Sequence, residues 1–147
     1  MNVNRCLYCY KPLNEDSKDF HEKCSRLFFG TAIPPVLDYN SDQMQELARE
    51  NVIKSIAVTG VQPKLSMEIE RRPNDPKTTR FTIVGLWGDY ILKPPAHEFP
   101  HLPENEDLTM HLAELAGISV AQHSLIRLKS GELSYIRPDG KSQVTVR

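Results

Sequence analysis

The placement of the cysteines constrains the fold of this chain more than any other feature. All three lie within the first 24 residues, as Cys6-x-x-Cys9 and, with a histidine, His21-x-x-Cys24. Two such pairs of ligands suit a tetrahedral Zn²⁺ ion, and the intervening residues can bring the pairs together. A segment of about 30 residues buries little core, so a metal cross-link would supply folding energy. We therefore predict a zinc-ribbon-like module over residues 1–33, with a structural Zn²⁺ bound by Cys6, Cys9, His21 and Cys24.

The alternative is that the cysteines are free and act as small hydrophobic residues, with His21 on the surface. Three cysteines cannot all pair with one another, which favours a reducing, cytoplasmic location. The chain has 147 residues and a net charge of -1, so its charge gives no reason to expect nucleic-acid binding. It also has no apolar run near the roughly 20 residues that cross a bilayer. We therefore expect a globular domain that contacts neither nucleic acid nor membrane.

A linker and a helix are predicted over residues 34–53. Pro34 and Pro35 interrupt the chain directly after the proposed module. Ser41 is suited to cap a helix, and apolar residues then recur at helical spacing at Met44, Leu47 and Ala48.

Residues 54–136 show mainly β patterns. Short apolar or alternating runs occupy residues 56–58, 65–69, 81–84, 90–92, 124–128 and 133–136. The segment from Gly85 to Asp89 indicates a hairpin between the runs on either side of it. Glu104 to Ala116 reads as the main helix, with a stripe of leucines for packing and Gly117 as its stop signal. These patterns predict an α+β fold, a mostly antiparallel sheet with one main packed helix.

Three polar features in this region are candidates for a functional site. A turn containing Gly60 precedes Lys64, Lys93 ends an apolar strand, and Glu106 lies in the first turn of the main helix. Each has an ordinary alternative: a hairpin with a charged lysine, a solvated lysine, and a glutamate that interacts with the helix dipole. A strand lysine held by a helix carboxylate is, however, how protein kinases position nucleotide phosphates.

Taken in order, these segments resemble the N-terminal part of the HipA family of bacterial serine/threonine-kinase toxins. The resemblance rests on the runs Ser55 to Ser66, Tyr90 to Pro95 and Glu104 to Asp107, and it covers residues 52–136. The cysteine-rich start, with Phe28-Phe29-Gly30, is similar to an extension found in a subset of the family.

The resemblance implies a kinase N-lobe that binds ATP and, together with a C-lobe, Mg²⁺. Lys93 would contact the α- and β-phosphates, Glu106 would orient Lys93, and residues 133–136 would lead to the adenine-binding hinge. A phosphate-covering loop would be formed by Thr59, Gly60, Val61, Gln62 and Lys64. Family members phosphorylate a protein substrate, commonly an aminoacyl-tRNA synthetase, and a DNA-binding antitoxin restrains them.

Two departures from the family pattern qualify what the resemblance implies. Many members have an autophosphorylated serine where this chain has Ala57. Residues 137–147 form an atypical tail instead of continuing into a C-lobe with the catalytic base and the Mg²⁺-binding aspartate. We therefore assign no catalytic residue, and expect a truncated lobe, inactive alone, or a subunit served by a separate C-lobe chain.

The alternative function is a zinc-stabilised interaction or regulatory module without nucleotide chemistry. Its partner surface would include Phe28, Phe29, Trp87 and the segment from Pro94 to Pro103, unless these aromatic residues belong to the core.

Overall fold

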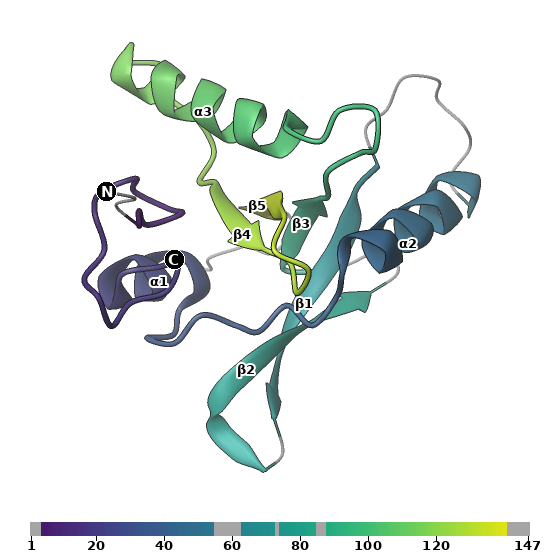
Figure 1. The fold of residues 1–147 in the computed structure, drawn as a ribbon, viewed down its shortest axis with the longest axis horizontal. Coiled ribbons are helices and arrows are strands. Elements are labelled where there is room, and N and C mark those ends of the chain that lie inside the picture. Colours follow the sequence, from purple (N-terminus) through teal and green to yellow (C-terminus); the bar gives the residue numbers. More distant parts are fainter. Residues whose placement is uncertain (1–3, 55–62, 73, 85–87, 141–147) are drawn as a thin grey trace.

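The structure is a computed structural model that describes residues 4–54, 63–72, 74–84 and 88–140. Within these ranges the chain is an α+β fold with a five-stranded antiparallel sheet (Figure 1). The helices are α1 (Glu22–Phe29), α2 (Ser41–Lys54) and α3 (Leu102–Leu115). The strands are β1 (Leu65–Arg72), β2 (Asp75–Val84), β3 (Tyr90–Lys93), β4 (Ser124–Arg127) and β5 (Leu133–Pro138). The predicted α+β class and the mostly antiparallel sheet are confirmed. The predicted strand at residues 56–58 lies outside the described residues.

The order of the strands in the sheet is β2-β1-β3-β5-β4. Strand β1 is antiparallel to both β2 and β3, with Ser66 opposite Val84 on one side and Ile91 on the other. The predicted hairpin between β2 and β3 is therefore wrong. Leu65 and Met67 are fully buried, so β1 is a central strand and separates the two strands that follow it. Strands β1 and β2 form a hairpin whose tip projects from the body of the molecule in Figure 1.

Gly88 lies against the backbone of β1. A Cβ atom on Gly88 would lie 2.6 Å from the carbonyl oxygen of Met67 and 2.7 Å from its amide nitrogen. Because backbone atoms in a central strand cannot move aside cheaply, we expect Gly88→Ala to lower the free energy of unfolding by about 1–3 kcal/mol. Denaturant unfolding measures this change. Gly140→Ala is the matched control, since a Cβ there meets nothing within 4 Å, and equal effects of the two substitutions would contradict the packing argument.

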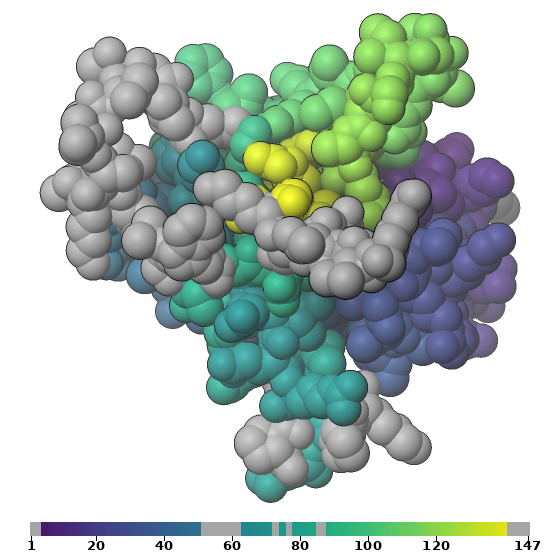
Figure 2. All heavy atoms as spheres, turned by 180° about the vertical axis from the view of Figure 1, so that it is seen from behind, coloured from purple at the N-terminus to yellow at the C-terminus, as the bar shows by residue number. Residues whose placement is uncertain are grey.

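The N-terminal residues share one hydrophobic core with the sheet. Phe28 and Phe29 on α1 pack against Tyr90, and Phe29 also contacts Phe81 of β2. The Tyr90 hydroxyl donates a 2.7 Å hydrogen bond to the carbonyl of Phe28. Both phenylalanines are therefore core residues and not an exposed partner surface, while Trp87 lies outside the described residues. From behind, Figure 2 shows the purple N-terminal residues in contact with the rest of the molecule.

The linker and α2 also join the sheet. Val36 pairs with the outer edge of β2. Its amide donates a 2.9 Å hydrogen bond to the carbonyl of Thr79, and its carbonyl accepts a 2.9 Å hydrogen bond from the amide of Phe81. Helix α2 begins at Ser41, but its cap is Asn40, whose side chain accepts a 2.9 Å bond from the amide of Gln43. Met44 and Ala48 are buried, as the helical spacing predicted.

The leucine stripe of α3 does not face the core. Leu108 is 47% exposed, Leu112 55% and Leu115 84%, so the packed face predicted for this helix is wrong. The buried face carries Pro103 and Asp107 instead. This orientation follows from polar contacts, since the inward carboxylates of α3 bind groups on the sheet and on the N-terminal segment. The stop signal is confirmed: Gly117 has φ 81°, and the amide of Ile118 bonds to the carbonyl of Ala113 at 2.9 Å.

Candidate nucleotide and metal sites

The structure brings Lys93 and Glu106 together. Lys93 is the last residue of β3, and Glu106 lies in the first turns of α3. The Nζ atom of Lys93 is 2.5 Å from Oε1 of Glu106, and both side chains are 22% exposed. Their partial burial limits screening by water, so the pair is held more firmly than an ion pair at the surface.

Tyr135 supports the lysine from the adjacent strand. Lys93 is paired with Tyr135 of β5, and the Lys93 ammonium lies 5.3 Å from the centre of the tyrosine ring. A cation over an aromatic face gains about 0.5–2 kcal/mol, depending on its exposure to water. Burial raises the pKa of Tyr135 to about 12, and the nearby charges of Glu106 and Asp107 add to this effect, so the ring stays neutral at physiological pH.

Most of the predicted phosphate-covering loop lies outside the described residues. This applies to Thr59, Gly60, Val61 and Gln62, and to Ala57. Lys64 is described, and it is exposed immediately before β1. The predicted roles of these residues in binding ATP remain predictions.

The four predicted metal ligands form a compact cluster. One ligand atom from each of Cys6, Cys9, His21 and Cys24 lies within 4.8 Å of the others. The first pair belongs to a turn closed by a bridge between Arg5 and Pro12, whereas the second pair flanks the start of α1. The second pair is therefore on a helix and not on a β-ribbon.

His21 is oriented as a metal ligand would be. Its Nε2–H donates a 2.9 Å hydrogen bond to the carbonyl of Pro12. Its Nδ1 atom faces the thiols, 3.5 Å from Sγ of Cys9 and 3.7 Å from Sγ of Cys24. A histidine whose outer nitrogen is held by a carbonyl presents its other nitrogen to a metal in a defined tautomer.

The thiols of this cluster have different acidities. Burial raises the pKa of the Cys24 thiol to about 12, and its sulfur neighbours Cys9 and Cys6 contribute to the increase. Burial also opposes ionisation of Cys6, but hydrogen bonds from backbone amides outweigh it and lower the pKa of that thiol. Three thiolates this close repel one another, and a divalent cation would remove that repulsion. The donor set and its geometry therefore fit Zn²⁺.

Tyr10 joins the cysteine-rich segment to α3. It follows Cys9 directly and has φ 63°, which is uncommon for a residue with a side chain. Its hydroxyl donates a short hydrogen bond to Oδ2 of Asp107, a fully buried carboxylate next to Glu106. The position of α3, and with it Glu106, is thus tied to the turn that carries the first two cysteines.

Sequence reasoning missed this polar cluster around Asp107, which also contains His123. Nδ1 of His123 is 2.7 Å from Oδ1 of Asp107. The signal in the sequence was weak: Asp107 and His111 are four residues apart and share a helix face, but Tyr10 and His123 are distant in the chain.

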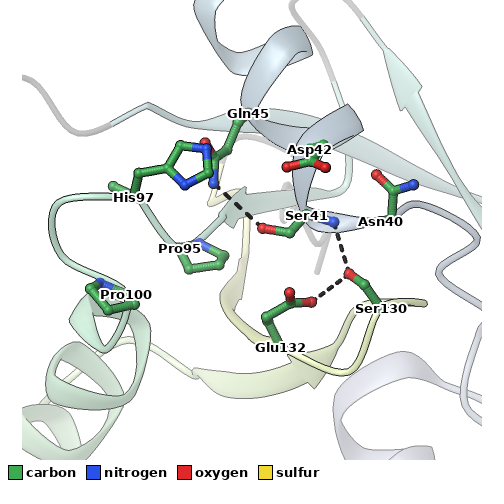
Figure 3. Close-up of a pocket in the computed structure, with 10 residues that line it drawn as sticks. Asn40, Ser41, Asp42, Gln45, Pro95, His97, Pro100, Ser130 and Glu132 are labelled. Carbon is green, nitrogen blue, oxygen red and sulfur yellow. Dashed lines mark hydrogen bonds between the residues drawn. The ribbon is translucent and has the colours of Figure 1, made fainter.

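A separate cavity of about 350 Å³, lined by both polar and apolar residues, lies at the start of α2 (Figure 3). Pro95, His97 and Pro100 line one side, and Ser130 and Glu132 from the β4–β5 turn line another. The amide of Ser41 donates a 2.9 Å bond to the hydroxyl of Ser130, which attaches this turn to α2. The segment from Pro94 to Pro103, which the sequence offered as a partner surface, contributes Pro95, Ala96, His97 and Pro100 to this cavity.

Comparison with known proteins identifies the family. The family model for the HipA-like C-terminal domain matches residues 56–139, more than half of the chain. This chain therefore belongs to the HipA-like family. It is also 36% identical over 73 residues to a Haemophilus influenzae protein named "Putative kinase". That match covers 50% of this chain and 19% of the relative, so the chain spans only a small part of the relative's length.

These findings support a protein related to HipA-family kinases. The matched model describes a C-terminal domain, so the predicted N-terminal position of this segment stays a prediction. Among the described residues, no helix combines the length and the apolar character that crossing a membrane requires.

Proposed function

We propose that this chain is the ATP-binding lobe of a HipA-like serine/threonine protein kinase. The observation that carries the proposal is the 2.5 Å contact between Lys93 on β3 and Glu106 on α3. In protein kinases the corresponding strand lysine pairs with a glutamate of the following helix, which holds the ammonium where it binds the nucleotide phosphates. Membership of the HipA-like family supports this interpretation.

The arrangement of the sheet supports the same proposal. The helix that carries Glu106 connects β3 to β4, and these strands are separated in the sheet by β5. This connection places the helix carboxylate beside the end of β3, where the lysine side chain leaves the strand. When bound, ATP with Mg²⁺ would supply the phosphoryl group and neutralise its charge. Lys93 would bind phosphate oxygens and Glu106 would keep the ammonium in place.

Phosphoryl transfer also requires metal ligands and a carboxylate that orients the nucleophile. We propose that the C-lobe of a HipA-like kinase supplies them, and that this chain alone does not catalyse transfer. On this proposal the kinase acts in a toxin–antitoxin system in the cytoplasm. Its partners would be a protein substrate and a DNA-binding antitoxin, as the family resemblance implies.

We also propose that Cys6, Cys9, His21 and Cys24 bind a structural Zn²⁺. With four protein ligands the ion would have no position left for a substrate, so its contribution is to folding. The orientation of His21 Nδ1 toward the thiols supports this assignment.

Titration of the purified chain with ATP and Mg²⁺ tests the nucleotide proposal. We expect saturable binding that Lys93→Ala weakens roughly tenfold or more, the effect of losing a charge-assisted hydrogen bond. Lys129→Ala, which truncates an exposed lysine in the β4–β5 turn, is the matched control and should bind as the wild type does. No binding at millimolar nucleotide, or equal binding by both variants, would contradict the proposal.

A second candidate is a zinc-stabilised interaction module without nucleotide chemistry. The exposed apolar residues along α3 and just beyond it favour this function, since such a face often binds another protein. They are Leu108, Leu112, Leu115 and Ile118. The same titration separates the two candidates, because the module would not bind ATP.

A further inference from the structure

Asp107, His111 and His123 form a second cluster of metal-ligating side chains. Asp107 and His111 lie on one face of α3, and His123 directly precedes β4. One ligand atom from each lies within 4.8 Å of the other two. Oδ1 of Asp107 is 2.7 Å from Nδ1 of His123, and Oδ2 is 3.4 Å from Nε2 of His111. Two imidazole nitrogens thus converge on a single carboxylate.

Glu114 faces the outer nitrogens of both histidines. Its Oε1 atom accepts a 3.2 Å hydrogen bond from Nε2 of His123, and its Oε2 atom is 3.9 Å from Nδ1 of His111. A carboxylate in this position favours the tautomers that carry the ring proton on the nitrogens facing Glu114. The lone pairs of the other two nitrogens, Nδ1 of His123 and Nε2 of His111, then point toward Asp107. The hydroxyl of Tyr10 donates a hydrogen bond to Asp107 and so orients the carboxylate. In metal sites, hydrogen bonds of this kind to the ligating side chains hold the ligands in the orientation that binds the metal.

The basic side chains that contact the carboxylates of this cluster are its two histidines. In the described part of the chain, neither Asp107 nor Glu114 forms an ion pair with a lysine or an arginine. Asp107 is fully buried, and Nε2 of His111 is buried without a hydrogen-bond partner. A proton on His123 satisfies the contact with Asp107 but leaves Nε2 of His111 unsatisfied. A divalent cation would balance both carboxylates and use both inner nitrogens.

A cavity of about 460 Å³ opens beside this cluster. Its lining includes Cys9 of the cysteine cluster as well as Tyr8, His111, Glu114, Val120, Gln122 and His123. Three protein ligands leave at least one coordination position of a metal open, and the cavity has room for water or a small anion there.

We propose that Asp107, His111 and His123 bind a second divalent transition-metal ion, distinct from the one at the cysteine cluster. Imidazole and carboxylate ligands suit Zn²⁺, Fe²⁺, Co²⁺ or Ni²⁺. The ion would connect α3 to the segment before β4, with an open position toward the cavity. This inference does not depend on ATP binding.

Metal titration of the full chain, without an affinity tag and stripped of metal, tests this inference. With Zn²⁺ we expect two equivalents bound by the wild type and one by His111→Gln. His111 is chosen because it is the least buried of the three ligands. His97→Gln, which changes an exposed histidine, is the matched control and should retain two. If the wild type bound one equivalent of Zn²⁺, or if His111→Gln bound two, the proposal would be overturned. The three residues would then form a hydrogen-bond network without a metal ion.

Titration with Co²⁺ keeps the test decisive if His111→Gln does not fold. In the wild type, the cysteine cluster should produce intense thiolate-to-cobalt absorption, and the second equivalent only weak absorption without a thiolate band. If every bound equivalent produced thiolate absorption, the second site would not exist. If the chain bound ATP but only one metal ion, this inference would be wrong and the proposed kinase function would stand. If it bound two metal ions but no ATP, the proposed kinase function would be wrong and this inference would stand.

Discussion

Cys24→Ser is expected to lower the free energy of unfolding by at least about 4 kcal/mol in the presence of Zn²⁺, the range associated with loss of a structural metal. Cys24 is buried on α1, four and five residues before Phe28 and Phe29. The serine removes a thiolate ligand, and α1 loses its attachment to the turn that carries Cys6 and Cys9. Thermal and denaturant unfolding, with the zinc content measured on the same samples, give the size of the effect.

The effect should extend beyond the cysteine-rich segment. Phe28 and Phe29 pack against Tyr90 of β3, so loosening α1 exposes one side of the sheet. Hydrogen exchange of Cys24→Ser should therefore lose protection in β3 as well as in α1. Lys23→Ala, on the exposed side of the same helix, is the control and should stay within about 0.5 kcal/mol of the wild type. A Cys24→Ser protein as stable as the wild type would exclude a structural metal.

Asp107→Ala is expected to destabilise the chain by about 3–5 kcal/mol, the usual result of removing one partner from a buried charged network. The substitution leaves the Tyr10 hydroxyl and Nδ1 of His123 without the buried carboxylate that they contact. It also removes the link between the first cysteine pair and α3. Denaturant unfolding measures the loss of stability.

Asn105→Ala is the control for this substitution, since Asn105 is an exposed residue of the same helix. It should change stability by less than about 0.5 kcal/mol. If Asp107→Ala and Asn105→Ala had similar small effects, the network around Asp107 would not hold α3 in place.

Several features could be read from short-range patterns. The cysteine and histidine spacing indicated a four-ligand cluster, because each pair chelates from one turn of chain. The strand that ends at Lys93 and the helix with Glu106 in its first turn were also recognisable from local periodicity. Their 2.5 Å contact was expected from the likeness to protein kinases, because local periodicity does not report which side chains of two elements meet.

Other features depended on contacts that local patterns do not report. The hairpin signal around Gly88 was misleading because β1 is inserted between β2 and β3. The leucines of α3 had the spacing of a packed face, yet the helix turns its carboxylates inward. Hydrophobic periodicity measures which residues share a face, and it does not say which face the rest of the molecule covers.

By itself, the amino-acid sequence determined the kind and order of most elements after residue 40, and the ligand pairs and charged residues, because each depends on neighbours a few residues away. It did not show helix α1. Only the tertiary structure decided the order of the strands, the orientation of α3 and the meeting of Tyr10, Asp107 and His123. Tyr10 and Asp107 are 97 positions apart, and contacts of that range depend on how complete elements pack and which buried polar groups find partners.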